Sequence, residues 1–180
     1  DGRALAFVAD DDHGREHVWV RDLATLDPRL LAGTDGASYP FWSPDGQSIG
    51  FFADGKLKKI AVAGGPPETV CDAASGRGGT WNRDGVIVFS AGPTSPLWRV
   101  PAAGGTPTRV TTRARDDSGA GDRFPVFLPD GRYLLYNHGS ATPETAGLYL
   151  TALAGGTPVR VLPDTTNALY APPPTPGAPG

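Results

Sequence analysis

Two short sequence markers recur along the chain in a fixed order. An Asp-Gly pair returns at intervals of about 40 to 45 residues, at Asp1-Gly2, Asp45-Gly46, Asp84-Gly85 and Asp130-Gly131. A second marker, Ala-Gly-Gly-x-Pro-x-x-Val, follows each of the last three pairs and begins at Ala63, Ala103 and Ala154. Two independent markers in the same phase indicate a structural repeat, in which each unit buries its apolar surface against its neighbours.

Each repeat predicts four short β-strands joined by turns. Ser-Pro-Asp-Gly between the first two strands suits a type I turn, with Pro at the second position and Gly at the fourth. Gly-Gly between the last two supplies the positive φ of a tight hairpin. The residues expected to shape the first turns are Ser43, Pro44, Asp45, Gly46, Asp84, Gly85, Asp130 and Gly131. Asp11 lies in a longer loop and is expected to matter less for stability than Asp45.

The second strand of each repeat shows no polar alternation. Because side chains alternate along a strand, Leu134 and Tyr136 face one way, and Tyr133 and Leu135 face the other. Both faces are therefore expected to be buried, as in a sheet stacked between two similar sheets. The pattern predicts an all-β fold, a β-propeller of four-stranded antiparallel blades that is either partial or small.

The repeats extend over residues 1–170, and the first of them is incomplete. We expect full blades at 39–71, 78–111 and 123–162, and a split blade at 1–33 that lacks its innermost strand. An unpaired inner edge favours aggregation, so residues 167–171 are predicted to pair with residues 4–8 and close the ring. The competing possibility is an open arc that self-associates through its edges. Residues 172–180, rich in Pro and Gly, are expected to form a disordered tail.

Composition excludes several classes of function. The net charge of −3 gives no basic surface for nucleic acid. The single cysteine, Cys71, excludes an internal disulfide and a cysteine-based zinc site. No apolar run approaches the roughly 20 residues of a membrane helix, so direct membrane insertion is not expected. Because the chain begins at Asp1 within the repeat, we expect a fragment of a longer protein.

Three motifs resemble catalytic or metal sites but lack the required context. His13–His17 reads H-x-x-E-H, which binds zinc only on a helix, and Gly14 interrupts any helix there. Asp10–Gly14 is acidic but lacks the spacing of a calcium loop. Ser118 lies in the turn-rich run Asp-Asp-Ser-Gly-Ala-Gly, which does not predict the strand–nucleophile–helix elbow of a serine hydrolase. We therefore predict no cofactor, no metal site and no catalytic residue in this chain.

The loops after the second and fourth strands vary most in length, and variable loops on a rigid scaffold commonly bind partners. The candidate binding residues on this face are Arg113, Arg115, Asp116, Asp117, Arg123 and His138. The arginines could bind an acidic or phosphorylated partner; the alternative is a solvated loop. A protein or peptide partner is expected.

These motifs also resemble a known family. Residues 39–60 and 124–136 are similar to the WD-like propeller repeat typified by TolB, whose blades carry Pro-x-Trp/Phe-Ser-Pro-Asp-Gly. The second blade keeps the motif in full, the fourth has Leu128 in place of the Ser, and the third has Asn82-Arg83 in place of Ser-Pro. The resemblance implies a propeller with a non-catalytic binding or scaffolding role, and it favours a periplasmic or other extracytoplasmic location.

A narrower resemblance involves three further runs of sequence. Residues 97–111, 123–136 and 166–173 are similar to the propeller that follows the kinase domain in bacterial serine/threonine kinases of the acidobacterial type. This implies a sensor region of a multidomain protein. Two alternatives remain open: the regulatory propeller of a prolyl-oligopeptidase-type hydrolase, and a TolB-like periplasmic propeller associated with transport.

Overall fold

The computed structural model describes residues 2–25, 27–112 and 119–171. In this part of the chain every regular element is a strand, and the strands form four antiparallel sheets. The first sheet contains β1 (Ala4–Asp10), β2 (Glu16–Asp22) and β3 (Pro28–Leu30). The second contains β4 (Ser38–Trp42), β5 (Ser48–Ala53), β6 (Lys56–Ala61) and β7 (Glu68–Asp72). The third contains β8 (Gly79–Trp81), β9 (Val86–Ser90), β10 (Leu97–Pro101) and β11 (Thr108–Arg109). The fourth contains β12 (Gly121–Phe127), β13 (Tyr133–Gly139), β14 (Gly147–Ala152) and β15 (Val159–Leu162).

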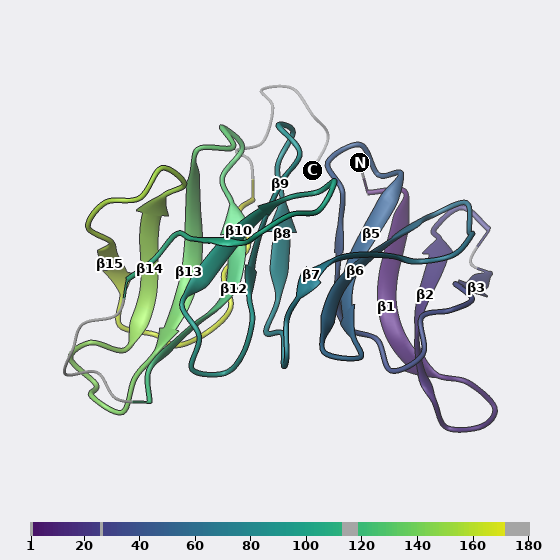
Figure 1. Ribbon diagram of the computed structural model, residues 1–180, viewed down its shortest axis with the longest axis horizontal. Coiled ribbons are helices and arrows are strands. Elements are labelled where there is room, and N and C mark those ends of the chain that lie inside the picture. The colour runs from purple at the N-terminus through teal and green to yellow at the C-terminus, as the bar shows by residue number, and fades with distance from the viewer. Residues whose placement is uncertain (1, 26, 113–118, 172–180) are drawn as a thin grey trace.

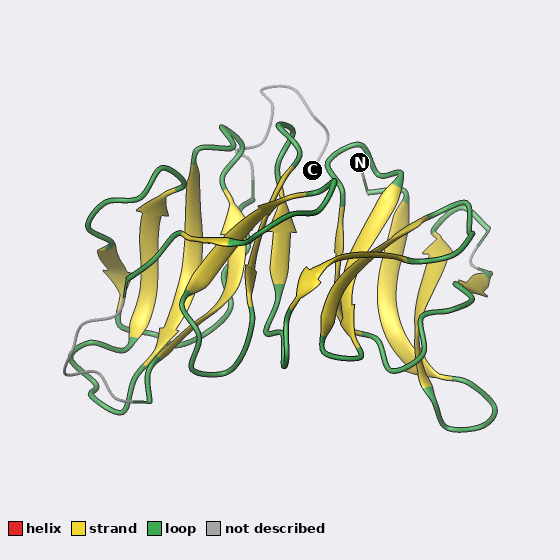
Figure 2. Cartoon of the chain, viewed as in Figure 1, coloured by secondary structure: helices red, strands yellow, loops and turns green. Residues whose placement is uncertain are grey.

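The sheets stand side by side in chain order, like the blades of a propeller (Figure 1). Figure 2 shows that each sheet is a meander of neighbouring strands. We call the sheets blades 1 to 4. The strands β4, β8 and β12 contact one another from blade to blade and are called the inner strands. Blade 1 has three strands and no inner strand. The prediction of an all-β propeller with three full blades and one incomplete blade is confirmed.

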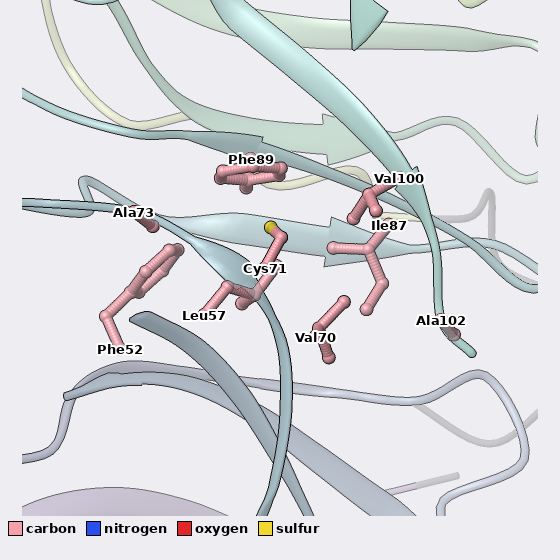
Figure 3. Close-up of a cluster of buried hydrophobic side chains, with 9 residues drawn as sticks. All are labelled: Phe52, Leu57, Val70, Cys71, Ala73, Ile87, Phe89, Val100 and Ala102. Atoms are coloured by element: carbon pink, nitrogen blue, oxygen red, sulfur yellow. The ribbon is translucent and has the colours of Figure 1, made fainter. Parts of the chain in front are cut away.

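The apolar cores lie between blades. Between blades 2 and 3, Phe52 and Leu57 pack toward Ile87 and Phe89, with Cys71 in the same cluster (Figure 3). Each fully buried side chain of this size stabilises the fold by about 1.5–3 kcal/mol. A strand such as β5 supplies both neighbouring cores, which explains why its sequence does not alternate.

Burial on both faces holds for the second strands of blades 2 and 3 but not for that of blade 4. All residues of β9 from Ile87 to Ser90 are buried, whereas Tyr133 at the start of β13 is 45% exposed. The expectation for Tyr133 and Leu135 is therefore wrong in part, because no further blade covers that face of blade 4 among the described residues.

The turns between the first and second strands of blades 2 to 4 share one backbone geometry and use different side chains. In each, the Gly N–H donates to the carbonyl three residues earlier, as Gly46 does to Ser43 at 3.0 Å. In blade 2, Ser43 Oγ accepts from Ser48 N, and Asp45 Oδ1 accepts from Gln47 N. In blade 4, Asp130 Oδ1 accepts from the N–H groups of Arg132 and Tyr133.

In blade 3 a single side chain, that of Asn82, accepts both of the hydrogen bonds that two side chains share in blade 2. Asn82 Oδ1 accepts from Asp84 N and Val86 N at 3.1 and 2.9 Å, and Asn82 Nδ2 donates to the Gly131 carbonyl at 3.1 Å. This contact joins the turn of blade 3 to the turn of blade 4.

The end of the described chain does not close a ring. Residues 167–171 lie in no strand, and the first sheet consists of β1, β2 and β3. The predicted pairing with residues 4–8 is therefore absent from this structure. Only a short connection separates residue 167 from β15, and the chain returns to the inner strands, whereas blade 1 lies at the opposite end of the molecule (Figure 1). The predicted tail, 172–180, lies outside the described residues.

Candidate functional site at the inner strands

Blades 2, 3 and 4 each place a residue with left-handed backbone just before or within the inner strand. The residues are Tyr39, Gly78 and Phe124, with φ of 49°, 88° and 52°. Each stands three positions before the aromatic residue that ends its inner strand. In blades 2 and 4 the pairing register shifts at this point, which marks a β-bulge. A left-handed conformation costs a non-glycine residue on the order of 1–3 kcal/mol, and such residues cluster at functional sites.

The two bulges bring aromatic rings from blades 2 and 4 together across blade 3. The ring centres of Tyr39 and Phe124 are 5.7 Å apart, with an interplanar angle of 57°. Gly78 lies between the two blades, and a Cβ atom on it would stand 3.0 Å from the Cα and Cδ1 atoms of Phe124. Glycine at position 78 therefore lets the two inner strands approach each other without a steric clash.

Arg77 supplies charge and a link between blades at the same place. Its guanidinium carbon lies 5.9 Å from the centre of the Tyr39 ring, within the range of a cation–π interaction. Its Nη1 donates to the Gly76 carbonyl at 3.0 Å. The Arg77 carbonyl accepts from Phe124 N at 2.9 Å. The arginine is thus held by local backbone groups with its cationic head beside the aromatic pair.

A pocket of about 190 Å³ adjoins these residues and is mostly apolar. Its wall on the inner strands is formed by Tyr39, Pro40, Gly78, Gly79, Phe124, Pro125 and Val126. Residues 167–169 form the remaining wall. The Leu169 side chain there is 88% exposed. The arrangement can accept a short extended segment, with apolar side chains on the rings and a positive charge nearby.

Of the residues singled out from the sequence, the two that the structure describes, Arg123 and His138, do not line this pocket. Arg113, Arg115, Asp116 and Asp117 lie outside the described residues. Arg123 Nε and Nη2 donate to the Pro93 carbonyl at 3.0 and 2.8 Å, so this guanidinium fastens β12 to the loop after β9.

His138 belongs to a polar cluster of blade 4. Its Nδ1 is 2.6 Å from Asp122 Oδ1, and Asp122, 3% exposed, also accepts from the Thr111 hydroxyl. The His138 ring meets Tyr149 edge-on, with centres 5.3 Å apart. The geometry holds the end of strand β13 against strands β12 and β14.

Sequence reasoning missed Tyr39, Arg77 and Phe124. One signal was available: Tyr39-Pro40 and Phe124-Pro125 repeat an aromatic-Pro pair at the same position of two blades. A residue before proline is restricted to extended conformations in most contexts. The left-handed backbone that brings the rings together was therefore not predictable from this pair.

A larger hollow lies at the opposite ends of the inner strands, where the turns of blades 3 and 4 meet. Its volume is about 460 Å³, and its lining includes Asn82, Arg83, Asp84, Asp130 and Gly131. Asn82 and Asp130 already bind backbone N–H groups within their turns. These two polar side chains of the hollow therefore serve the turns, and we take the inner-strand pocket as the stronger candidate for recognition.

The acidic and histidine residues of the first hairpin make contacts with one another. Asp11 Oδ1 accepts from His13 N and Arg15 N at 2.8 and 3.0 Å, and Asp11 Oδ2 lies 3.2 Å from His17 Nε2. Within the described ranges no group of three or more His, Cys, Asp or Glu side chains is placed to hold a metal ion.

Burial raises the pKa of the Cys71 thiol to about 11. None of the described elements is a helix with the length and apolarity to span a membrane.

Comparison with known proteins gives two relatives in sequence, and no protein-family model matches the chain. The chain is 28% identical over 148 residues to the uncharacterized peptidase YuxL of Bacillus subtilis, an alignment that covers 76% of this chain and 20% of that protein. It is 38% identical over 50 residues to the Tol-Pal system protein TolB of Alcanivorax borkumensis, covering 27% of this chain and 12% of that protein. The chain thus matches only a fifth or less of the length of either relative.

Solved structures show the same architecture at low sequence identity. A putative TolB from Agrobacterium tumefaciens superposes with a TM-score of 0.74 at 21% identity, over 88% of this chain and 61% of that one. The β-propeller domain of the Trilobed protease from Pyrococcus furiosus superposes with a TM-score of 0.55 at 16% identity, over 90% of this chain and 55% of that one. The chain is therefore a TolB-like β-propeller segment in fold.

Proposed function

We propose that this chain is a non-catalytic binding module that takes an extended peptide segment of a protein partner in the inner-strand pocket. The observation that carries the proposal is the Tyr39–Phe124 ring pair, built by two strained bulges in separate blades. Strain retained at one place in two repeats is typical of a functional site rather than of packing. If these positions served packing alone, glycine would be sufficient there, as Gly78 is at the equivalent position of blade 3.

The lining indicates the chemistry of the segment. Aromatic faces and prolines favour an aliphatic or proline side chain, since these bury apolar area at little cost in conformational entropy. Arg77 beside the rings favours a neighbouring acidic group. An extended backbone suits a narrow pocket because its side chains alternate between pocket and solvent.

Selection from a random peptide library on the full chain tests this proposal. The matched variant is Tyr39→Gly with Phe124→Gly, because glycine accepts the left-handed backbone and blade 3 already uses it there. We expect selected peptides to bind the wild-type chain and to lose at least about tenfold in affinity for the double variant, about 1.4 kcal/mol. Leu23→Ala, at a side chain that is 48% exposed in a distant turn, is the control and should bind normally.

The thermal melting of the double glycine variant must stay close to that of the wild type, which shows that the fold survives. Selected peptides that bind both proteins equally would refute the inner-strand pocket as the binding site. A selection that yields no binder at all would refute the binding module itself.

The wider context of this module is a separate proposal. The resemblance to kinase-fused propellers suggests a sensor region of a bacterial serine/threonine kinase. The match to peptidase YuxL favours a second candidate, the regulatory propeller of a serine hydrolase. A TolB-like periplasmic propeller is the third. The coding sequence on either side of this segment decides among them: kinase motifs before it, a Gly-x-Ser-x-Gly domain after it, or a signal peptide alone.

A further inference from the structure

A further hollow lies between blades 2 and 3, toward their outer strands. Its volume is about 450 Å³, within the range of small-molecule sites. The end of β7 contributes Asp72, β9 contributes Phe89, β10 contributes Trp98, and Pro107 comes just before β11. None of these residues lines the inner-strand pocket, so the hollow is independent of the function proposed above. We call it the Trp98 hollow.

The Trp98 side chain is held in place by groups of its own blade. Its Nε1 donates to Ser95 Oγ at 2.9 Å, and the guanidinium carbon of Arg109 lies 5.2 Å from the ring centre. Its cross-strand neighbour Phe89 is fully buried in the core between blades 2 and 3 (Figure 3). Because the indole N–H already has an acceptor, Trp98 offers the hollow the apolar surface of its ring. A ring that is already ordered loses little conformational entropy when a ligand packs on it.

The same row of residues in the neighbouring blades offers no such surface. By strand register, the row Phe89–Trp98–Arg109 corresponds to Phe51–Lys58–Thr69 in blade 2 and to Tyr136–Tyr149–Arg160 in blade 4. Blade 2 thus has a lysine in the place of the tryptophan. In blade 4 the Tyr149 ring is stacked on Tyr136, with centres 5.8 Å apart, and its hydroxyl donates to the Thr145 carbonyl. Packing between blades therefore does not require a tryptophan in this row.

Hydrogen-bond acceptors and charges of both signs lie at the rim of the hollow. The Asp72 side chain is 86% exposed and binds Lys56 through Oδ1. A carboxylate can accept about four hydrogen bonds, so Asp72 keeps capacity for donors of a ligand. Ser95 Oγ accepts from Trp98, and a hydroxyl oxygen has a second lone pair. The negative charge of Asp72 and the positive charges of Lys56 and Arg109 together disfavour a ligand of either charge.

We propose that the Trp98 hollow binds a neutral sugar ring. A pyranose has C–H groups across its face and hydroxyl groups around its edge. The face fits the apolar surface of Trp98, and the hydroxyls supply donors for Asp72 and Ser95. A wholly apolar ligand would displace water from these two side chains without replacing its hydrogen bonds.

Titration of the full chain with glucose, galactose and mannose tests the proposal, followed by tryptophan fluorescence and by isothermal titration calorimetry. We expect at least one sugar to bind with a millimolar or lower dissociation constant and to change the fluorescence. Asp72→Ala should weaken this binding at least about tenfold, and Trp98→Ala should abolish it together with the fluorescence change. Glu68→Ala is the matched control and should bind normally, because Glu68 is an exposed residue of the same strand that pairs with Lys59 and does not line the hollow.

Charged derivatives of the same ring test the charge argument. The amino sugar and the uronic acid that correspond to the bound sugar carry a positive and a negative charge, and each should bind more weakly than the neutral parent. Thermal melts show whether the variants fold, and the exposed Asp72 decides the outcome if Trp98→Ala does not. The proposal is overturned if none of the three sugars binds, or if a charged derivative binds more tightly than its neutral parent. Wild-type affinity of the Asp72→Ala chain would overturn it as well.

Discussion

At the scale of single residues, the backbone conformation at the inner strands limits which residue a position accepts more than side-chain type does. Gly78 combines a φ of 88° with a position at which a Cβ atom would stand 3.0 Å from Phe124 of the neighbouring inner strand. Gly78→Ala should therefore destabilise the chain by about 1–3 kcal/mol, measured by urea unfolding. Gly92→Ala is the control, since its nearest atom would be 4.0 Å away and its backbone is not left-handed; a loss as large as that of Gly78→Ala would contradict the strain argument.

Asp11 shows how a loop residue can be more constrained than its sequence indicates. The sequence predicts a dispensable loop position, but backbone N–H donors from Arg15 and His13 lower the pKa of the Asp11 carboxyl from 3.8 to about 2. A lowered folded-state pKa stabilises the fold above the unfolded value and loses that contribution as pH falls through the folded value. Asp11→Ala should therefore melt at a lower temperature than wild type at pH 7, and the difference should vanish near pH 2. A difference that does not change with pH would rule this out.

At the scale of elements, the sequence predicted the strands and their turns well because both follow local rules. Short apolar runs, Gly-Gly and Asp-Gly are local signals, and the strands lie where these signals place them. The turn of blade 3 is less obvious, because Asn82-Arg83 replaces Ser-Pro. One amide there replaces a hydroxyl and a carboxylate, and it reaches the next blade as well.

That triple role makes Asn82 the most sensitive of the turn positions. Asn82 is 4% exposed, and Asn82→Ala removes the partner of Asp84 N and Val86 N. Each lost hydrogen bond costs about 0.5–1.5 kcal/mol, so the midpoint of urea unfolding should fall by a corresponding amount. Asn82→Asp keeps the acceptor and loses only the bond to Gly131, so it should recover part of the loss. Equal losses for both variants would show that the blade contact, not the turn, matters.

At the scale of the whole molecule, the sequence predicted the repeat correctly but not the arrangement of the two ends of the chain. The repeat is encoded in each blade, whereas closure depends on how many blades are present and how far apart the first and last lie. The alternation of Ala168 to Ala171 is too short to set a strand register, and residues 167–169 instead lie against the inner strands. The aromatic pair was missed for a related reason, since it joins blades 2 and 4 and no local pattern records that contact.

The unequal environment of equivalent positions gives a test of the open arc. Leu134 and Leu5 hold the same place in blades 4 and 1, yet they are 0% and 52% exposed. Removing a buried leucine costs about 2–5 kcal/mol through lost transfer energy and the cavity left behind. Leu134→Ala should therefore destabilise the chain by this amount, and Leu5→Ala by about 1 kcal/mol or less. Both losses are measured by urea unfolding. Equal losses would mean that Leu5 is covered within its own chain, and the blades would then form a closed ring rather than the arc described.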